Sequence, residues 1–235
     1  MEQEPAIVWT RPERGTRGPA AAHSRTELAA VAVALADRGG LSAVSMRQVA
    51  RELGTGQASL YRYISGRDDL LDLMTDTVTG EVDLDAPLSG DPVTDLLALA
   101  TRTRAVHLRH PWLPEIPPEP LRLGPRGLDY LEHALRAMAP VRLPGGTKTE
   151  IVALMNALVA QFARTELQGG RTATGRQAAQ AAYLSEAAAR GDRPHLAAAL
   201  HGEPATPPAP PAPPGELFER AMHRMLTGLL APGLG

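Results

Sequence analysis

Residues 45–71, SMRQVARELGTGQASLYRYISGRDDLL, decide the fold of this 235-residue chain. Apolar residues in the first part of this stretch recur at the spacing of one helical face, at Met46, Val49, Ala50 and Leu53. Gly54 interrupts the pattern, and Leu60 and Ile64, four residues apart, anchor a second short helix to the same core. Two short amphipathic helices joined by a tight turn at a glycine predict a helix-turn-helix.

The second of these helices keeps small and polar residues at its N-terminal end, as a helix that enters the DNA major groove must. Gln57 and Ser59 are predicted to contact base edges, because a glutamine amide can pair bidentately with adenine. Arg62 fits either a guanine or a phosphate. The predicted DNA-binding residues are Ser45, Arg47, Thr55, Gln57, Ala58, Ser59, Tyr61, Arg62, Tyr63 and Arg67.

Several of these residues also have a structural interpretation. Ser45 stands where a helix N-cap is expected, and Arg47 is equally compatible with a solvated helix surface. Tyr61 and Tyr63 can reach phosphates through their hydroxyl groups, or pack against the core. Arg67 lies at a predicted helix N-terminus, where the helix dipole disfavours a cation, so a phosphate contact is expected to account for it.

The stretch resembles the tetracycline-repressor (TetR) family of DNA-binding regulators. The family pattern is met in order and spacing at Ser45, Val49, Ala50, Gly54, Leu60, Tyr61, Tyr63, Gly66, Arg67, Leu70 and Leu71. Two departures stand out: Thr55-Gly56 replaces the common Val-Ser, and Ile64 replaces Phe. Gly56 removes a possible capping side chain from the second helix, a role that Thr55 could take over. The resemblance implies a dimeric, ligand-responsive transcriptional repressor.

The rest of the chain is also predicted to be helical, which makes the fold class all-α. We expect a three-helix head with the helix-turn-helix and a helical regulatory and dimerisation body, with about nine to ten helices in all. The predicted helices cover about 24–38, 45–53, 57–64, 67–82, 92–110, 125–139, 148–168, 174–190, 194–201 and 216–230. The predicted divisions are a flexible Arg-containing arm at 1–22, the DNA-binding domain at 23–70, and the body at 71–235 with a Pro/Ala linker at 204–214.

Composition and charge agree with a DNA-binding head on an acidic body. Residues 1–67 carry nine Arg against six acidic residues, a balance of +3, whereas the whole chain carries −2. Such a basic end is a usual footprint of nucleic-acid binding. The chain has no cysteine, which excludes disulfides and Cys-based zinc sites. We predict no metal, no cofactor, no membrane span and no signal peptide, and therefore a cytoplasmic location.

The body is expected to hold a small hydrophobic or amphipathic effector in a mostly apolar pocket. The stretch from Arg109 to Leu113 and the last helix resemble the regulatory domain of the tetracycline-repressor branch. The candidate effector-binding residues are His107, Trp112, Tyr130, His133, Asn156, Gln161 and Phe162. The resemblance also implies a homodimer through the helices at 174–190 and 216–230, although their apolar faces could instead pack within one subunit. A dimer predicts a palindromic operator.

Two other functional classes compete with this interpretation. An enzyme is disfavoured because the sequence contains no nucleophile elbow, phosphate-binding loop, dinucleotide-binding glycines or zinc-protease motif. A DNA-binding regulator without a small-molecule effector, either constitutive or responsive to a protein, remains an alternative. The hypothesis for effector action is that the effector shifts the fourth helix, so that the two recognition helices no longer fit successive major grooves of the DNA.

Overall fold

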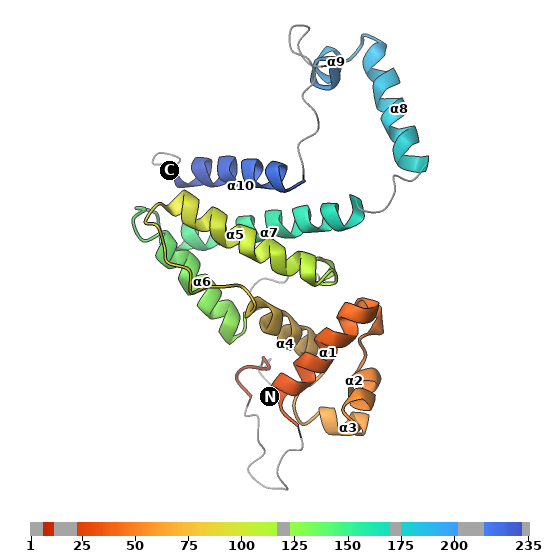
Figure 1. The fold of residues 1–235 in the computed structure, drawn as a ribbon, viewed down its shortest axis with the longest axis vertical. Coiled ribbons are helices and arrows are strands. Elements are labelled where there is room, and N and C mark those ends of the chain that lie inside the picture. The colour runs from red at the N-terminus through yellow and green to blue at the C-terminus, as the bar shows by residue number, and fades with distance from the viewer. Residues whose placement is uncertain (1–6, 12–22, 117–122, 170–174, 202–213, 232–235) are drawn as a thin grey trace, which may run out of the picture.

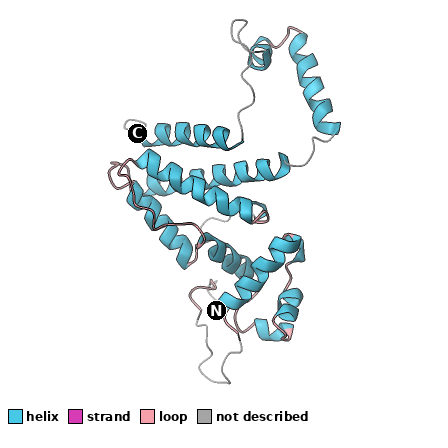
Figure 2. Cartoon of the chain, in the orientation of Figure 1, coloured by secondary structure: helices cyan, strands magenta, loops and turns pink. Residues whose placement is uncertain are grey.

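The computed structural model describes residues 7–11, 23–116, 123–169, 175–201 and 214–231, and within these ranges it contains helices and loops but no strand (Figures 1 and 2). The all-α prediction is therefore confirmed. The elements are α1 (Arg25–Gly39), η1 (Leu41–Ala43), α2 (Met46–Glu52), α3 (Gln57–Leu60), α4 (Arg67–Thr79), α5 (Pro92–Arg109), η2 (Leu113–Glu115), α6 (Pro125–Ala137), α7 (Gly145–Gly169), α8 (Gly175–Ala189), α9 (Pro194–His201) and α10 (Pro214–Leu230).

Side-chain caps explain where the first two helices of the head begin. Ser24 and Glu27 form a reciprocal capping box at the start of α1. The Ser45 hydroxyl accepts the backbone N–H of Gln48 at 3.2 Å, so its predicted capping role is confirmed. Gly54 ends the turn after α2 with φ = 65°, a conformation that favours glycine. Regular α-helix in α3 ends at Leu60, and hydrogen-bonded turns continue the segment to Ile64.

The body packs α5 against α7 and α10, with α6 lying beside α5 and α7 (Figure 1). Helix α4 packs on α1 at the head and on α6 and α5 at the body, and therefore joins the two parts. A single apolar cluster runs from Leu28 of α1 to Leu230 of α10 and is rich in Leu, Val, Ala and Met. Phe218 and Met222 of α10 are fully buried in it, so much of the stripe expected to face a partner packs inside its own subunit.

Helices α8 and α9 pack on each other and stand away from the remaining helices (Figure 1). In α8 only Ala187 and Ala188 are buried among the residues whose exposure is described, and Tyr183 is 57% exposed. Helix α8 thus presents a long uncovered surface.

Residues 7–11 lie within the flexible arm that is expected over 1–22. Residues 7–11 form a turn that packs against the rest of the chain, with Val8 completely buried. The Arg11 guanidinium forms an ion pair with Asp69 of α4. The buried Val8 side chain and the Arg11–Asp69 ion pair hold this segment in place. A flexible arm would make no such contacts. Residues 1–6 and 12–22, and the Pro/Ala stretch up to residue 213, lie outside the described residues. No helix in the described ranges is long and apolar enough to cross a membrane.

Candidate functional site

The outer face of α2 and α3 carries most of the predicted DNA-binding side chains. Ser45, Arg47, Gln57, Ala58, Tyr61, Arg62 and Arg67 are exposed, and Thr55 and Ser59 are half-buried. Helix α3 has no side-chain cap, because Gly56 occupies the N-cap position. The Ser59 hydroxyl donates to the Gly56 carbonyl at 2.7 Å and lies 2.7 Å from the Thr55 hydroxyl. These two hydroxyl groups brace the start of the helix. The Ser59 hydroxyl is therefore engaged within the recognition segment itself.

The two tyrosines of this segment have different surroundings. Tyr61 is 53% exposed, whereas Tyr63 is 5% exposed. The Tyr63 hydroxyl accepts the backbone N–H of His23 at 3.2 Å, at the start of α1. The structure therefore leaves Tyr61 available to a partner and places Tyr63 in the core of the head.

Arg67 fastens α4 to the preceding part of the head. Its guanidinium donates to the carbonyl of Val44 at 2.6 Å and to that of Leu41 at 3.3 Å. Two residues later, the Asp69 carboxylate accepts the backbone N–H and the hydroxyl of Ser65. Burial alone would raise the pKa of Asp69, but the hydrogen bonds from Ser65 and Arg11 lower the pKa overall. Both residues fix the angle at which α4 leaves the head.

The body contains a cavity of about 420 Å³ between α4, α5, α6 and α7. Four of the seven predicted effector-binding residues line it: His107, Tyr130, Asn156 and Gln161. The other lining residues are mainly apolar or small, with a few polar ones: Thr75, Asp76, Thr79, Val82, Thr103, Val106, Leu113, Pro114, Ile116, Leu123, Gly127, Ala157, Ala160 and Arg164.

Hydrogen-bonding groups converge at one wall of the cavity. The Tyr130 hydroxyl donates to the Asn156 side-chain oxygen at 2.7 Å and lies 3.2 Å from the Thr103 hydroxyl. Burial raises the pKa of Tyr130 to about 12 and lowers the pKa of His107 to about 4, so both are neutral near pH 7. Within the described part of the chain, His107 Nδ1 and Thr75 Oγ1 are buried without a hydrogen-bond partner. The cavity can therefore offer an occupant uncharged polar contacts within a mainly apolar lining.

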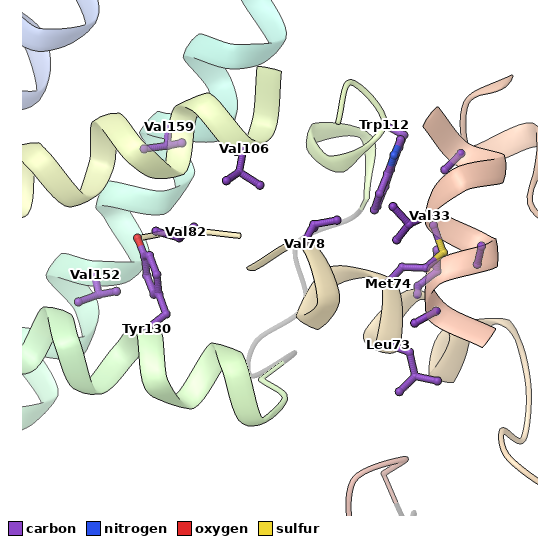
Figure 3. Packing of buried hydrophobic residues seen from close by; sticks show 14 of the residues in the cluster. Val33, Leu73, Met74, Val78, Val82, Val106, Trp112, Tyr130, Val152 and Val159 are labelled. Carbon is purple, nitrogen blue, oxygen red and sulfur yellow. The ribbon is translucent and has the colours of Figure 1, made fainter. Parts of the chain in front are cut away.

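The other three predicted effector-binding residues do not line the cavity. Trp112 lies on the side of α1, away from Tyr130 (Figure 3), and its indole N–H donates to Asp37 at 2.6 Å. Phe162 packs edge-on against Phe218 of α10, with 5.5 Å between the two ring centroids. His133 is 3% exposed and its Nδ1 lies 3.2 Å from the Arg136 guanidinium.

Sequence reasoning missed the contribution of α4 to the cavity, which comes from Thr75, Asp76 and Thr79. One signal was present in the sequence. Asp76 follows Asp69 by seven residues, which places both carboxylates on one face of the helix. Both are buried in the structure, and a buried carboxylate needs a partner.

An exposed polar recognition segment on a head, together with a body whose cavity is partly lined by the helix that packs on that head, is the arrangement expected of a DNA-binding regulator of transcription. Residues 28–74 match the family described as "Bacterial regulatory proteins, tetR family", and residues 84–232 match "Tetracyclin repressor-like, C-terminal domain". The chain belongs to the TetR family. It is a helix-turn-helix transcriptional regulator and not an enzyme.

Curated relatives and solved structures agree with this assignment. The chain is 36% identical over 162 residues to the transcriptional repressor DrrR1 of Streptomyces coeruleorubidus, a match covering 68% of this chain and 60% of DrrR1. It is also 36% identical over 140 residues to an HTH-type transcriptional regulator of Saccharopolyspora erythraea, covering 59% and 58% of the two chains. The matches thus span less than two thirds of either curated relative.

The fold is similar to that of ActR from Streptomyces coelicolor. The apo structure of ActR superimposes with a TM-score of 0.71 at 28% identity, covering 90% of this chain and 97% of ActR. ActR in complex with (S)-DNPA gives a TM-score of 0.71 at 27% identity, with 91% and 100% of the two chains covered. ActR has also been solved in complex with actinorhodin. This structural relative therefore binds small molecules.

Proposed function

We propose that the protein is a homodimeric repressor that binds a palindromic operator and is released from it by a small hydrophobic or amphipathic effector. One observation carries this proposal: helix α4 packs against α1 of the head and also supplies Thr75, Asp76 and Thr79 to the cavity wall. A molecule bound in the body therefore touches the element that orients the head. Because the operator is DNA, we expect the protein to act in the cytoplasm.

The DNA-binding part of the proposal is supported by the exposed face of the head. Gln57, Tyr61 and Arg62 lie together on one segment and are all exposed. Arg47 adds a positive charge on α2 that suits a phosphate. We assign base contacts to Gln57 and Arg62 and phosphate contacts to Arg47 and Tyr61.

The dimer is supported by uncovered apolar surface on α8 and α10. Tyr183 and Leu184 of α8 are 57% and 38% exposed, and Leu217 of α10 is 45% exposed. A partner subunit that covered these side chains would remove them from water. Two heads in one dimer would read half-sites about one turn of DNA apart.

Selection of bound duplexes from a random DNA pool, repeated at two salt concentrations, tests DNA recognition. The expected result is a palindrome that persists at the higher salt, since phosphate attraction alone weakens steeply with salt. Gln57→Ala should bind the selected duplex roughly 5- to 150-fold more weakly, the effect of losing one good base contact. Gln168→Ala, at an exposed position of α7, should bind it as tightly as the unsubstituted protein. Sequence-independent binding would contradict the proposal.

A thermal-shift measurement separates this proposal from its alternative, a regulator with no small-molecule effector. Actinorhodin, which ActR binds, is one probe to include in a panel of apolar and amphipathic compounds. A cavity ligand must raise the Tm, because it binds the native state. If no compound in a broad panel raises the Tm, a constitutive or protein-responsive regulator becomes the better account.

A further inference from the structure

A side chain of α4 caps the N-terminus of α6. The N-cap position of α6 is Gly124, which has no side chain to accept the free backbone N–H groups of the first turn. The Asp76 carboxylate accepts two of them, from Arg126 at 2.9 Å and from Gly127 at 3.0 Å. A carboxylate at a helix N-terminus is also favoured by the helix dipole. Helices α4 and α6 are thus tied together by one carboxylate.

The contact between the two helices is close and largely buried. Asp76 is 9% exposed, and a Cβ atom added to Gly124 would lie 2.3 Å from its Oδ1 atom. The same added atom would lie 2.5 Å from the ring of Trp9, in the docked N-terminal segment. Glycine at this position therefore permits the approach that the capping bond requires. Burial raises the pKa of Asp76, although the N–H groups of Gly127 and Arg126 act to lower the pKa.

The capping bond lies in the wall of the cavity. Asp76 and Gly127, an acceptor and one of its donors, both line the cavity. Thr75 and Thr79, the neighbours of Asp76 on α4, line it as well, and the Thr75 hydroxyl is buried without a partner in the described part of the chain. A molecule that fills this end of the cavity must contact both sides of the α4–α6 junction.

The other end of α4 is held firmly by the head. Arg67 binds the carbonyl of Val44, Asp69 binds Ser65, and Leu70 and Met74 are buried in the core next to α1. The N-terminal part of α4 is therefore fixed to the head. Figure 1 shows α4 between α1 and α6. The loop after α5 also reaches the head, where His110 and Trp112 bind Asp37 of α1.

We propose that Asp76 is the positioning residue through which the cavity sets the orientation of the head. The proposal rests on the proposed function, in which an effector releases DNA. With the cavity empty, the capping bond holds α4 at the angle that suits the operator. An occupant weakens the bond between Asp76 and the first turn of α6, and α4 carries the head away from that angle.

The absence of cysteine from the chain allows a covalent occupant to replace the unknown effector. Ala160 lines the cavity and is half-exposed, so Ala160→Cys can be labelled with monobromobimane. Labelled and unlabelled Ala160→Cys protein is compared in four backgrounds. One carries no further change, called the unsubstituted background, and the others carry Asp76→Ala, Asp76→Asn or Asp129→Asn. Asp129 is an exposed carboxylate on α6 and serves as the charge-matched control. The readouts are affinity for the selected duplex and hydrogen exchange at the amides of Arg126 and Gly127.

In the unsubstituted background we expect the label to weaken operator binding by about tenfold, within the usual range of coupling between two sites, and to speed exchange at both amides. Asp76→Ala should show fast exchange before labelling, and the label should change its operator affinity by less than about twofold. Asp76→Asn keeps an acceptor oxygen and should respond to the label almost as Asp129→Asn does.

Two outcomes would overturn the proposal: an equal effect of the label with and without the Asp76 side chain, or no effect of the label in the unsubstituted background. Failure of the unlabelled protein to bind any specific duplex would contradict the proposed function instead. In that case the exchange measurement still decides whether cavity occupancy acts on the α4–α6 junction through Asp76.

Discussion

The head and the body of this protein present their functional residues in different ways. In the head, the candidate DNA contacts lie within residues 45–67, on α2, α3, the turns beside them and the first residue of α4. Their spacing in the sequence therefore mirrors their arrangement in space. In the body, the cavity is lined from α4, α5, α6 and α7, whose residues are up to 89 positions apart, from Thr75 to Arg164. A surface that meets a partner of fixed geometry can thus be recognised from local sequence, whereas a cavity needs the tertiary fold.

The largest effect is expected where the two regions meet, at Trp112. This side chain is 1% exposed, and it lies on the side of α1 in Figure 3. Trp112→Ala should lower the free energy of unfolding by about 3–5 kcal/mol, as large-to-small core substitutions do. Trp112→Phe keeps most of the ring and loses the N–H bond to Asp37, and should cost about 1–3 kcal/mol.

Denaturant unfolding of both variants measures these losses, with Leu128→Ala as a control at a position that is 56% exposed. The control should change stability by no more than about 0.5 kcal/mol. A loss for Trp112→Ala as small as that of the control would mean that Trp112 does not hold the head to the body.

His107, the neutral histidine of the cavity, predicts that the free energy of unfolding depends on pH. Burial lowers the pKa of His107 to about 4, below its ordinary value of 6.5. Between these values the unfolded chain binds a proton that the folded chain does not. The free energy of unfolding therefore falls as the pH drops from about 6.5 to about 4, by up to roughly 3 kcal/mol from this one group.

The matched variant is His107→Gln, which cannot titrate in this range. Urea unfolding at pH 7 and pH 4.5 should show a loss of stability that is roughly 2–3 kcal/mol larger for the unsubstituted protein than for the variant. Equal losses in both proteins would show that His107 is not held neutral by burial.

The two tyrosines of the recognition segment sharpen the contrast between a binding side chain and a packing side chain. Tyr61→Phe should leave stability unchanged and weaken operator binding by about 1.5–3 kcal/mol, the usual contribution of a hydrogen bond to a charged group. Tyr63→Phe removes a buried hydroxyl that accepts the His23 N–H. It should cost about 1 kcal/mol in stability and leave operator binding nearly unchanged. The reverse pattern, from anisotropy and unfolding measurements, would refute this division of roles.

The smallest effect is expected at Ser45, which combines both roles. Ser45→Ala removes the cap of α2 and should destabilise the protein by about 1 kcal/mol. Ser45→Asp keeps a capping oxygen and should retain stability, but its negative charge next to phosphate should weaken operator binding. Thermal unfolding and anisotropy on the same two variants provide the check. If Ser45→Asp bound the operator as tightly as the unsubstituted protein does, Ser45 would not lie next to a DNA phosphate.

Much of the fold could be predicted from local chemistry. Ser24, Ser45 and Asp91 mark three helix starts because each side-chain oxygen accepts the N–H three residues ahead, and Asp91 caps α5 directly before Pro92. Gly54 is also recognisable from local sequence, because the turn after α2 needs a positive φ, which glycine adopts readily.

The missed features depend on contacts between distant parts of the chain. Trp112 follows Pro111 in a loop, and the sequence does not show which side the indole ring faces. Its partner, Asp37, lies 75 residues earlier. Asp76 acquires its role only because the uncapped start of α6, 50 residues later, lies against α4. Tyr63 was grouped with Tyr61 because its buried partner, the N–H of His23, is a backbone group that leaves no trace in side-chain patterns.

The most direct test of the account is the Kd of the selected operator, measured by fluorescence anisotropy with and without a saturating compound that raises the Tm. The account predicts that the compound raises the operator Kd by about tenfold or more, and that operator raises the Kd of the compound by the same factor. A compound that occupies the cavity and leaves the operator Kd unchanged would contradict the link between body and head.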